Sequence, residues 1–151
     1  MSTSTSTGTS TSTTETGIRI ERVLQATIDR VYAAWTKPEL LTRWYCPNPE
    51  LELKVDADVR VGGSYVVTMG PHIVRGTYTK LDPPQLIAFT WKWDHADGAA
   101  SQVRVELSEV DGGTRMLLSH TGLENAEDVK NHLRGWEGDL VRLPLLLAES
   151  S

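Results

Sequence analysis

The chain has 151 residues, a net charge of −5, 39% hydrophobic residues and 23% charged residues, which suits one globular domain with a hydrophobic core. The acidic balance without a run of Lys and Arg argues against binding to nucleic acid or to anionic membranes, and no apolar stretch reaches the roughly 18 residues that a membrane-spanning helix needs. The single cysteine, Cys46, excludes an internal disulfide, and with no signal-peptide pattern at the start we expect a cytoplasmic protein.

The first 17 residues are almost all Ser and Thr. Such a segment has no apolar surface to bury and thereby offset the entropy of ordering. We therefore expect residues 1–17 to be a disordered tail and residues 18–148 to form the single domain.

A first strand and two helices are predicted next. Residues 18–26 open with apolar and charged residues in alternation, as a half-buried strand does. Thr27 is a suitable helix N-cap, and Asp29 lies in the first turn, where a carboxylate interacts favourably with the positive helix end. This helix should end at Lys37, because the residue before a proline avoids the helical region, and Pro38 can open a second, short helix.

Six strands are predicted between the short helices and the end of the chain. Alternating residues mark four of them, at 51–55, 64–69, 103–108 and 115–120. Another lies between turns at 72–81, and the one at 86–93 is apolar on both sides, as a strand covered on both faces or at a rim would be. Turn residues separate them, and Asp111-Gly112-Gly113 in particular predicts a hairpin. Connections of hairpin length imply antiparallel pairing in one sheet.

The segment from Leu123 to Leu147 is predicted to be one long helix. Its apolar residues recur at intervals of three and four and so share one face: Val129, Leu133, Trp136, Leu140, Leu143 and Leu147. Roughly 25 residues give a helix of about 35 Å. Pro144 predicts a kink or the end of the helix, because proline removes a backbone hydrogen bond. Gly135 and Gly138 each weaken a helix by about 1 kcal/mol relative to Ala.

Together these elements predict an α+β domain. An antiparallel sheet of about six to seven strands twists and curls, so the long helix can lie across its concave face with the two short helices at one end. Where the apolar faces of helix and sheet do not meet, the gap is an apolar cavity, which is the usual form of a small-molecule site.

Several short motifs stand in the order of one known family. Residues 35–44 match its helix pair, residues 58–65 (DVRVGGSY) match its D-x-R-x-G-G-x-[YF] turn, and further matches lie at 76–78, 82–86, 89–91, 119–123 and 135–136. Over residues 18–147 the chain resembles the START-like, birch-pollen-allergen-like (SRPBCC) superfamily. Within it, the chain is most similar to the AHSA family, the homologues of the activator of a heat-shock-protein ATPase.

This resemblance implies a helix-grip fold, in which a curved sheet wraps around a long C-terminal helix and leaves a deep hydrophobic cavity between them. It does not imply one activity, because relatives include co-chaperone domains, polyketide aromatases and cyclases, resistance proteins and lipid carriers. Function therefore has to be argued from the site.

Two residues are candidates for catalysis. His120 shares a face with Met116 and Leu118 and could act as a general base or anchor a ligand, or it could support the fold through hydrogen bonds at a strand end. Arg75 could bind a ligand carboxylate, or it could point outward, because the alternation around it is not decisive.

A wider set is predicted to line the cavity and bind an apolar or aromatic ligand. Rigid aromatic side chains suit flat ligands, and methionine suits an adaptable wall, although core packing explains the same residues. The predicted ligand-binding residues are Tyr65, Met69, Trp91, Trp93, Met116, His120, Leu133, Trp136 and Leu140.

Neither a metal nor a cofactor is predicted. His95 stands between acidic residues in a polar loop, while His120 and His132 lie on different elements without a third ligand. Cys46 is expected to be a buried, inert thiol. No phosphate loop, dinucleotide fingerprint or G-x-S-x-G turn is present.

Three functions remain open at this stage. The first is a binding protein for a small polyketide-, flavonoid- or lipid-like molecule. The second is an enzyme of the polyketide cyclase, aromatase or hydrolytic kind that uses the same cavity. The third is a co-chaperone-like ATPase activator, for which the resemblance is the sole motive. This third function would also imply a stress-response role and a contact with a chaperone or with a second copy of the chain.

Overall fold

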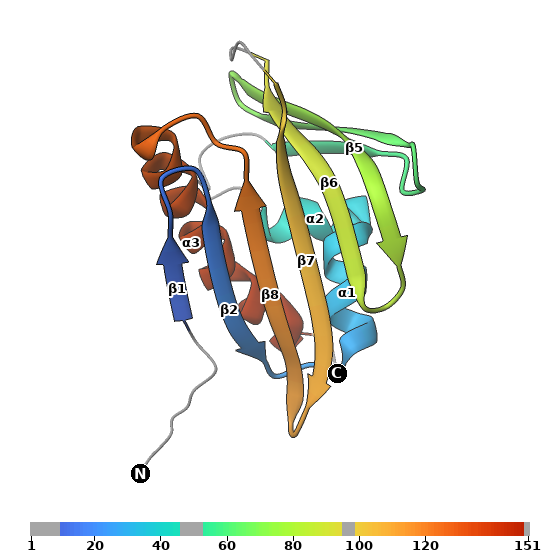
Figure 1. The fold of residues 1–151 in the computed structure, drawn as a ribbon. Helices are drawn as coiled ribbons and strands as arrows, with labels where there is room; N and C mark the ends of the chain where they lie inside the picture. Colours follow the sequence, from blue (N-terminus) through green and yellow to red (C-terminus); the bar gives the residue numbers. More distant parts are fainter. Residues whose placement is uncertain (1–9, 46–52, 95–98, 150–151) are drawn as a thin grey trace.

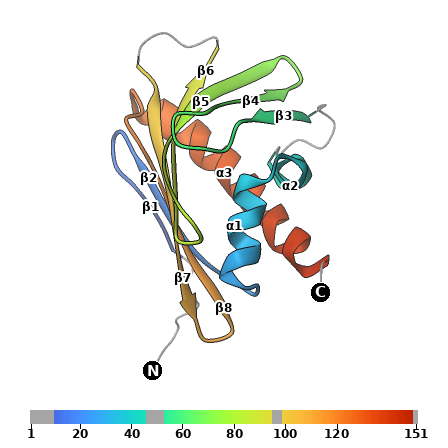
Figure 2. The same cartoon turned by 90° about the vertical axis from the view of Figure 1, so that its right-hand side faces the viewer.

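The structure, a computed structural model, describes residues 10–45, 53–94 and 99–149. These residues form one curved antiparallel sheet with three helices on its concave side (Figures 1 and 2). In chain order the elements are β1 (Ser10–Thr13), β2 (Ile18–Leu24), α1 (Ile28–Thr36), α2 (Pro38–Trp44), β3 (Leu53–Ala57), β4 (Ser64–Met69), β5 (His72–Asp82), β6 (Leu86–Trp93), β7 (Ser101–Val110), β8 (Gly113–Thr121) and α3 (Ala126–Glu149). The predicted α+β class and order of elements are confirmed.

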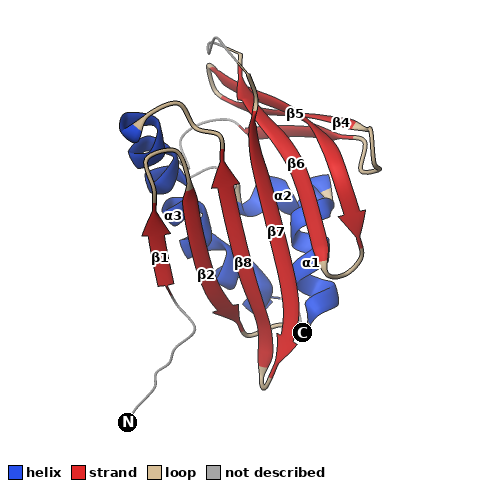
Figure 3. Cartoon of the chain, viewed as in Figure 1, coloured by secondary structure: helices blue, strands red, loops and turns tan. Residues whose placement is uncertain are grey.

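The strand order in the sheet is β1-β2-β8-β7-β6-β5-β4-β3, and every neighbouring pair is antiparallel (Figure 3). From β3 to β8, strands that follow one another in the chain are also neighbours in the sheet, as hairpin connections require. Strand β2 pairs with β8. The predicted hairpin at 111–113 is confirmed: Val110 pairs with Gly113, and Gly112 takes the positive φ of 81° that such a turn favours. Side chains that point from the concave face and from the helices form the core, in which Ile20, Ile87 and Leu118 are fully buried.

The sheet has eight strands, more than the six to seven predicted, and the difference includes β1 in the Ser/Thr-rich segment. Residues 10–13 lie within the tail that we expected to be disordered, yet they pair with residues 18–21 of β2. All four side chains of β1 are exposed, so the pairing consists of main-chain hydrogen bonds, which leave no hydrophobic pattern in a sequence. Residues 1–9 lie outside the described part of the chain, as do Cys46 and His95.

The two short helices begin and end where the sequence predicts. The Thr27 side chain accepts a hydrogen bond from the Arg30 amide at 3.3 Å and so caps α1. Lys37 ends α1 in an extended conformation, and Pro38 opens α2. The Trp44 indole donates to the carbonyl of Ala34 at 3.0 Å, which holds α2 against α1.

The long helix α3 lies across the concave face (Figure 2). Its predicted stripe is buried except at Leu133, which is half-buried. Of the two outcomes expected at Pro144, a kink or the end of the helix, the end does not occur there, because α3 continues to Glu149. The reason is tertiary: Leu146 and Leu147 in the next turn are buried, and this packing outweighs the one backbone hydrogen bond that proline removes.

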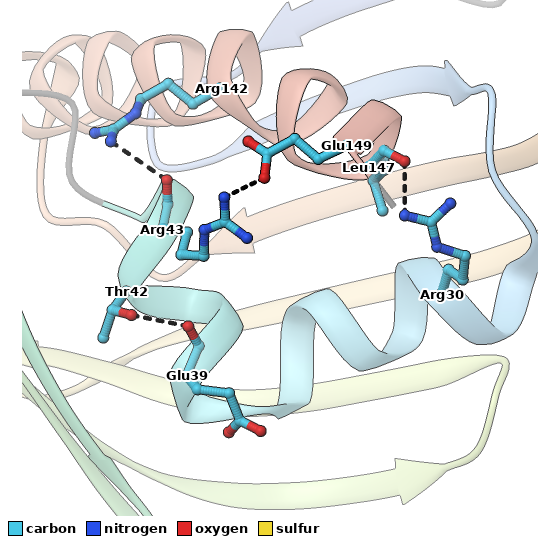
Figure 4. A network of polar contacts seen from close by, with 7 residues as sticks. All are labelled: Arg30, Glu39, Thr42, Arg43, Arg142, Leu147 and Glu149. Carbon is cyan, nitrogen blue, oxygen red and sulfur yellow. Dashed lines mark hydrogen bonds and ion pairs between the residues drawn. The ribbon is translucent and has the colours of Figure 1, made fainter. Parts of the chain in front are cut away.

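Three arginines form hydrogen bonds and an ion pair that connect the last turns of α3 to α1 and α2 (Figure 4). Arg30 donates to the carbonyl of Leu147 at 2.6 Å, and Arg142 donates to the carbonyl of Arg43 at 3.3 Å. Arg43 itself forms an ion pair with Glu149. Cations at helix C-termini bind carbonyls that have no partner within the helix and complement the helix dipole.

Replacing Gly135 in α3 by alanine should raise the free energy of unfolding by about 1 kcal/mol, since Gly is the poorer helix former. A methyl group built at Gly135 meets no atom within 4 Å, so no steric cost offsets the gain. Urea unfolding of the variant and the wild type measures this difference. A loss of stability would show that the open space at Gly135 is needed.

Candidate ligand-binding site

The five tryptophans of the chain meet between α3 and the sheet. With one tyrosine they form what we call the aromatic cluster: Trp35, Trp44, Tyr45, Trp91, Trp93 and Trp136. Trp136 is central, with ring centroids 5.3 Å from Trp91, 6.0 Å from Trp35 and 6.0 Å from Tyr45. The mostly edge-on and tilted contacts are the arrangement that aromatic pairs prefer.

The cluster draws its members from four elements: Trp35 from α1, Trp44 and Tyr45 from the end of α2, Trp91 and Trp93 from β6, and Trp136 from α3. On α1 and α3 the tryptophan is part of the apolar helix face, so amphipathic packing alone directs it inward. On β6 the two tryptophans share one face of the strand, but Trp93, near the strand end, is only half-buried.

His120 lies against the cluster and is fully buried, with 0% of its surface exposed. The Trp136 indole donates to its Nδ1 at 3.0 Å. Its Nε2 therefore carries the proton and donates to Ser101 Oγ at 2.7 Å, and Ser101 in turn donates to the carbonyl of Trp91 at 3.1 Å. This chain of hydrogen bonds uses both ring nitrogens of a neutral imidazole and fixes its tautomer.

The same surroundings keep the His120 imidazole neutral near neutral pH and make it a weak base. Burial disfavours the charged imidazolium, and His132 lies beside it at a ring distance of 5.1 Å, so the pKa of His120 falls to about 3. The geometry matches the fold-supporting role that we considered for this residue.

This low pKa should make stability fall in acid. An unfolded histidine has a pKa near 6.5. Below that pH the unfolded chain therefore binds a proton at this residue, whereas folded His120 stays unprotonated. The His120 contribution to the free energy of unfolding should therefore fall by up to about 1.4 kcal/mol per pH unit as pH drops from 6.5 toward 3. Urea unfolding of wild type and His120→Gln between pH 4.5 and 7.5 measures it. The wild-type minus variant difference should shrink in acid, and a constant difference would contradict the prediction.

His132 joins β6 to α3 beside the cluster. Trp93 donates its indole N–H to His132 Nε2 at 2.9 Å, and His132 Nδ1 donates to the carbonyl of Asp128 at 2.7 Å. Both ring nitrogens are again used, with the opposite tautomer to that of His120. This bond explains why the half-buried Trp93 is held in place at the end of its strand.

Three buried polar atoms of the site have no hydrogen-bond partner within the described part of the chain: Trp35 Nε1, Trp91 Nε1 and Asp139 Oδ1. Asp139 is 5% exposed and lies on the inward face of α3, three residues after Trp136. Burial raises its carboxyl pKa well above the ordinary value, although Arg142 opposes the shift. Native proteins leave few such atoms unpaired, and an unpaired one calls for an explanation.

Next to the cluster lies a second aromatic group, made of Tyr65, Tyr78 and Phe89. Tyr65 donates its hydroxyl to the carbonyl of Thr90. Burial raises the pKa of Tyr65 well above its usual value and that of Tyr78 to about 12, so both phenols are protonated. The group borders, with Trp35 and Tyr45, a residual space of about 10 Å³, which is room for one water molecule at most.

The deep cavity that the fold resemblance implies stays a prediction. Among the described residues, aromatic side chains pack against one another between α3 and the sheet. The space of about 10 Å³ lies to one side of this contact, between the short helices and strands β3 to β6, with no residue of α3 in its lining. A larger concavity of about 540 Å³ lies elsewhere, open to solvent beside the start of β6, and is lined in part by Asp82, Leu86, Glu106 and Glu109.

The predicted site residues separate into groups. Trp91, Trp93, His120 and Trp136 come together in and around the cluster. Tyr65, Met69, Met116 and Leu140 are buried in the same core, and Leu133 is half-buried on α3. Their contact with a ligand stays a prediction.

Arg75 does not join this site. Its side chain is 57% exposed and forms a two-pronged ion pair with Asp94 at 2.7 and 3.2 Å. Its neighbour Val74 takes the inward position on β5. Four residues that complete the site are not among the predicted ones: Trp35, Tyr45, Ser101 and Asp139. A signal existed for Asp139, because residue 139 falls within the helical stripe between Trp136 and Leu143.

Among the described residues, no group of three or more His, Cys, Asp or Glu side chains is placed to hold a metal ion. Within the same ranges, no helix is both long and apolar enough to cross a membrane.

Comparison with known proteins decides the family. The family described as "Activator of Hsp90 ATPase homolog 1-like protein" matches residues 25–148. The chain belongs to this family. No curated protein matches the chain significantly.

Solved structures of AHSA-type proteins share the fold. Protein CV1439 from Chromobacterium violaceum is 28% identical, with a TM-score of 0.77 over 87% of this chain and 97% of that one. CalU16 from Micromonospora echinospora is 25% identical, with a TM-score of 0.70 over 87% of this chain and 75% of that one. DynU16, described as a protein of the dynemicin biosynthetic locus, is 20% identical, with a TM-score of 0.77 over 89% of this chain and 48% of that one. The helix-grip fold of the AHSA type is thereby confirmed.

Proposed function

We propose that this AHSA-family protein binds a small flat aromatic or apolar molecule between α3 and the sheet. The observation that carries the proposal is the aromatic cluster, in which rings from α1, α2, β6 and α3 meet around Trp136. Stacking on such rings favours a planar ligand beyond simple burial of apolar area. The occurrence of the same fold in a protein of a biosynthetic locus supports the proposal.

Binding at this site requires side chains to move, because the rings around Trp136 already contact one another there. A ligand of drug size needs some 300 Å³ or more. The bound conformation is then a minor state of the free protein, and its low population weakens the apparent affinity. We expect dissociation constants in the micromolar range or weaker for ligands that do not match the site well.

An amide chemical-shift titration tests the proposal. Flat polyketides, flavonoids and fatty acids are added in turn, and the shifts should cluster on Trp91, His120 and α3. Trp136→Leu should weaken the best ligand about tenfold by removing a stacking surface. Val141→Ala, at an exposed position of the same helix, should leave binding unchanged. Shifts confined to the outer face of the sheet, or none across the panel, would contradict the proposal.

The enzymatic alternative depended on two catalytic candidates that would act together, and the structure does not bring them together. His120 is buried in a closed hydrogen-bond chain while Arg75 pairs with Asp94 at the surface, so the two cannot serve one substrate. The ATPase-activator alternative keeps the support of the family description alone. Binding to the chaperone at tens of micromolar, together with silence across the ligand panel, would favour it.

A further inference from the structure

The three unpaired polar atoms of the site belong to side chains that surround the same two rings. Trp35 and Trp91 contact Trp136, and both contact Tyr45 at ring distances of 6.3 and 6.2 Å. Asp139 follows Trp136 by nearly one helical turn and interacts electrostatically with Tyr45. Two indole N–H donors and one carboxyl oxygen, Oδ1 of Asp139, are thus gathered around Tyr45 and Trp136 without hydrogen-bond partners among the described residues.

Elsewhere in the same cluster the indole N–H groups are paired. Trp44 donates to Ala34, Trp93 donates to His132 and Trp136 donates to His120. The fold therefore satisfies indole donors where they serve the fold alone. Each buried donor that stays unpaired has lost its hydrogen bond to water without replacement, and a ligand can remove this cost by accepting the hydrogen bond.

Tyr45 occupies the position between these groups. It follows directly after α2 as the C-cap of that short helix, while Trp35, Trp91 and Trp136 lie inside regular elements. A residue at the end of a seven-residue helix can change its backbone conformation at less cost than one inside a helix or strand. Outward rotation of Tyr45 would free the volume of its ring beside both unpaired indoles and join it to the small space that Tyr45 and Trp35 border.

We propose that Trp35 Nε1, Trp91 Nε1 and the Asp139 carboxyl group form the polar lining of the ligand site, which is opened by displacement of Tyr45. The ligand is then a fused aromatic molecule with a carbonyl oxygen that accepts from an indole and a hydroxyl group that donates to Asp139. This inference rests on the proposed function, which it sharpens from ring stacking to a defined pattern of donors and acceptors.

Four related probes test the pattern: naphthalene, 2-acetylnaphthalene, 2-naphthol and 6-acetyl-2-naphthol. The first offers stacking alone, the next two offer one polar group each, and the last offers an acceptor and a donor. Each group that pairs with a buried, unpaired atom should tighten binding about fivefold to tenfold. By calorimetry or tryptophan fluorescence, 6-acetyl-2-naphthol should therefore bind the wild type tightest, by more than tenfold over naphthalene.

Single substitutions show which side chain causes each gain in affinity. Trp35→Phe or Trp91→Phe should abolish the advantage of the ketone, and Asp139→Leu should abolish that of the hydroxyl. Trp93→Phe removes an indole N–H that the fold already pairs, so it should weaken all four probes alike and keep the two affinity ratios. Val141→Ala, on the exposed face of α3, should leave all four affinities unchanged. Tyr45→Ala should tighten all four probes alike by removing the displaced ring. Circular dichroism shows whether each variant is folded, and the comparison of ligands on the wild type stands whether or not the variants fold.

The outcomes separate the two proposals. If no probe binds the wild type or Tyr45→Ala at millimolar concentration, both the binding function and its polar pattern fail. If naphthalene binds as tightly as 6-acetyl-2-naphthol, the binding function survives and the polar pattern is overturned, as it would be if internal water molecules satisfied the three atoms.

Discussion

Replacing Asp139 by asparagine should raise the free energy of unfolding at pH 7 by clearly more than the change of about 0.5 kcal/mol that is usual for surface substitutions. Asp139 is 5% exposed, and burial raises its carboxyl pKa well above the ordinary value. At pH 7 the unfolded chain carries it ionised, so folding must either protonate it or bury a charge. Asparagine keeps the shape and the carbonyl oxygen and avoids that cost.

The pH dependence identifies the cause of this gain. A carboxyl group with a raised folded pKa binds more protons in the folded state, so its destabilising effect grows as pH rises above about 4. Asp139→Asn should therefore match the wild type near pH 4 and gain stability steadily up to the folded pKa. Urea unfolding at several pH values measures the difference. Glu137→Gln, at an exposed position of the same helix, should stay within about 0.5 kcal/mol. A gain for Asp139→Asn that is equal at pH 4 and 7 would contradict the assignment.

His120 and Asp139 oppose each other in acid. As pH falls from 6.5 toward 4, the lowered pKa of His120 reduces stability while the raised pKa of Asp139 increases it. The wild type can then look insensitive to pH although two buried groups titrate abnormally. Comparison of single variants with the wild type separates the two contributions.

The sequence predicts the fold well because the fold rests on hydrophobic periodicity and turn chemistry. Alternation along β7 and β8 and the turn at 111–113 define a hairpin, and the pairing from Gln102–Thr121 to Val110–Gly113 confirms it. The stripe of α3 predicts the helix that crosses the sheet. Strand β1 escapes prediction because main-chain pairing at the edge of a sheet needs no apolar side chain.

The site is predicted less completely, because burial and hydrogen bonding depend on which elements meet. Trp91 and Trp136 follow from their faces on β6 and α3. The role of His120 depends on Ser101 from β7, whose approach is set by sheet register and not by local sequence. The ring of Tyr45 occupies space beside Trp136, and its position depends on where the short helix α2 ends.

Replacing Gly76 by alanine should destabilise the protein more than the other substitutions considered above, by about 4 kcal/mol or more. A methyl group built at Gly76 would stand 2.0 Å from the carbonyl oxygen of Thr90 on β6 and 2.5 Å from the ring of Tyr65. The backbone carbonyl cannot move without separating β5 from β6, and the same oxygen accepts the Tyr65 hydroxyl. Thermal unfolding should show a drop in Tm of about 10 °C or more.

Two control variants distinguish this close approach from other effects of glycine. Gly62 has a φ of +86° and nothing within 4 Å of a built methyl group, so Gly62→Ala tests backbone strain alone and should cost about 1 kcal/mol. The double variant Gly76→Ala with Tyr65→Ala removes the ring but leaves the Thr90 carbonyl in place, so it should not recover stability. Recovery in the double variant would locate the conflict at the tyrosine ring. Equal losses for Gly76→Ala and Gly62→Ala would show that β5 can shift to admit a side chain, and the contact between β5 and β6 at Gly76 would then not be what requires glycine.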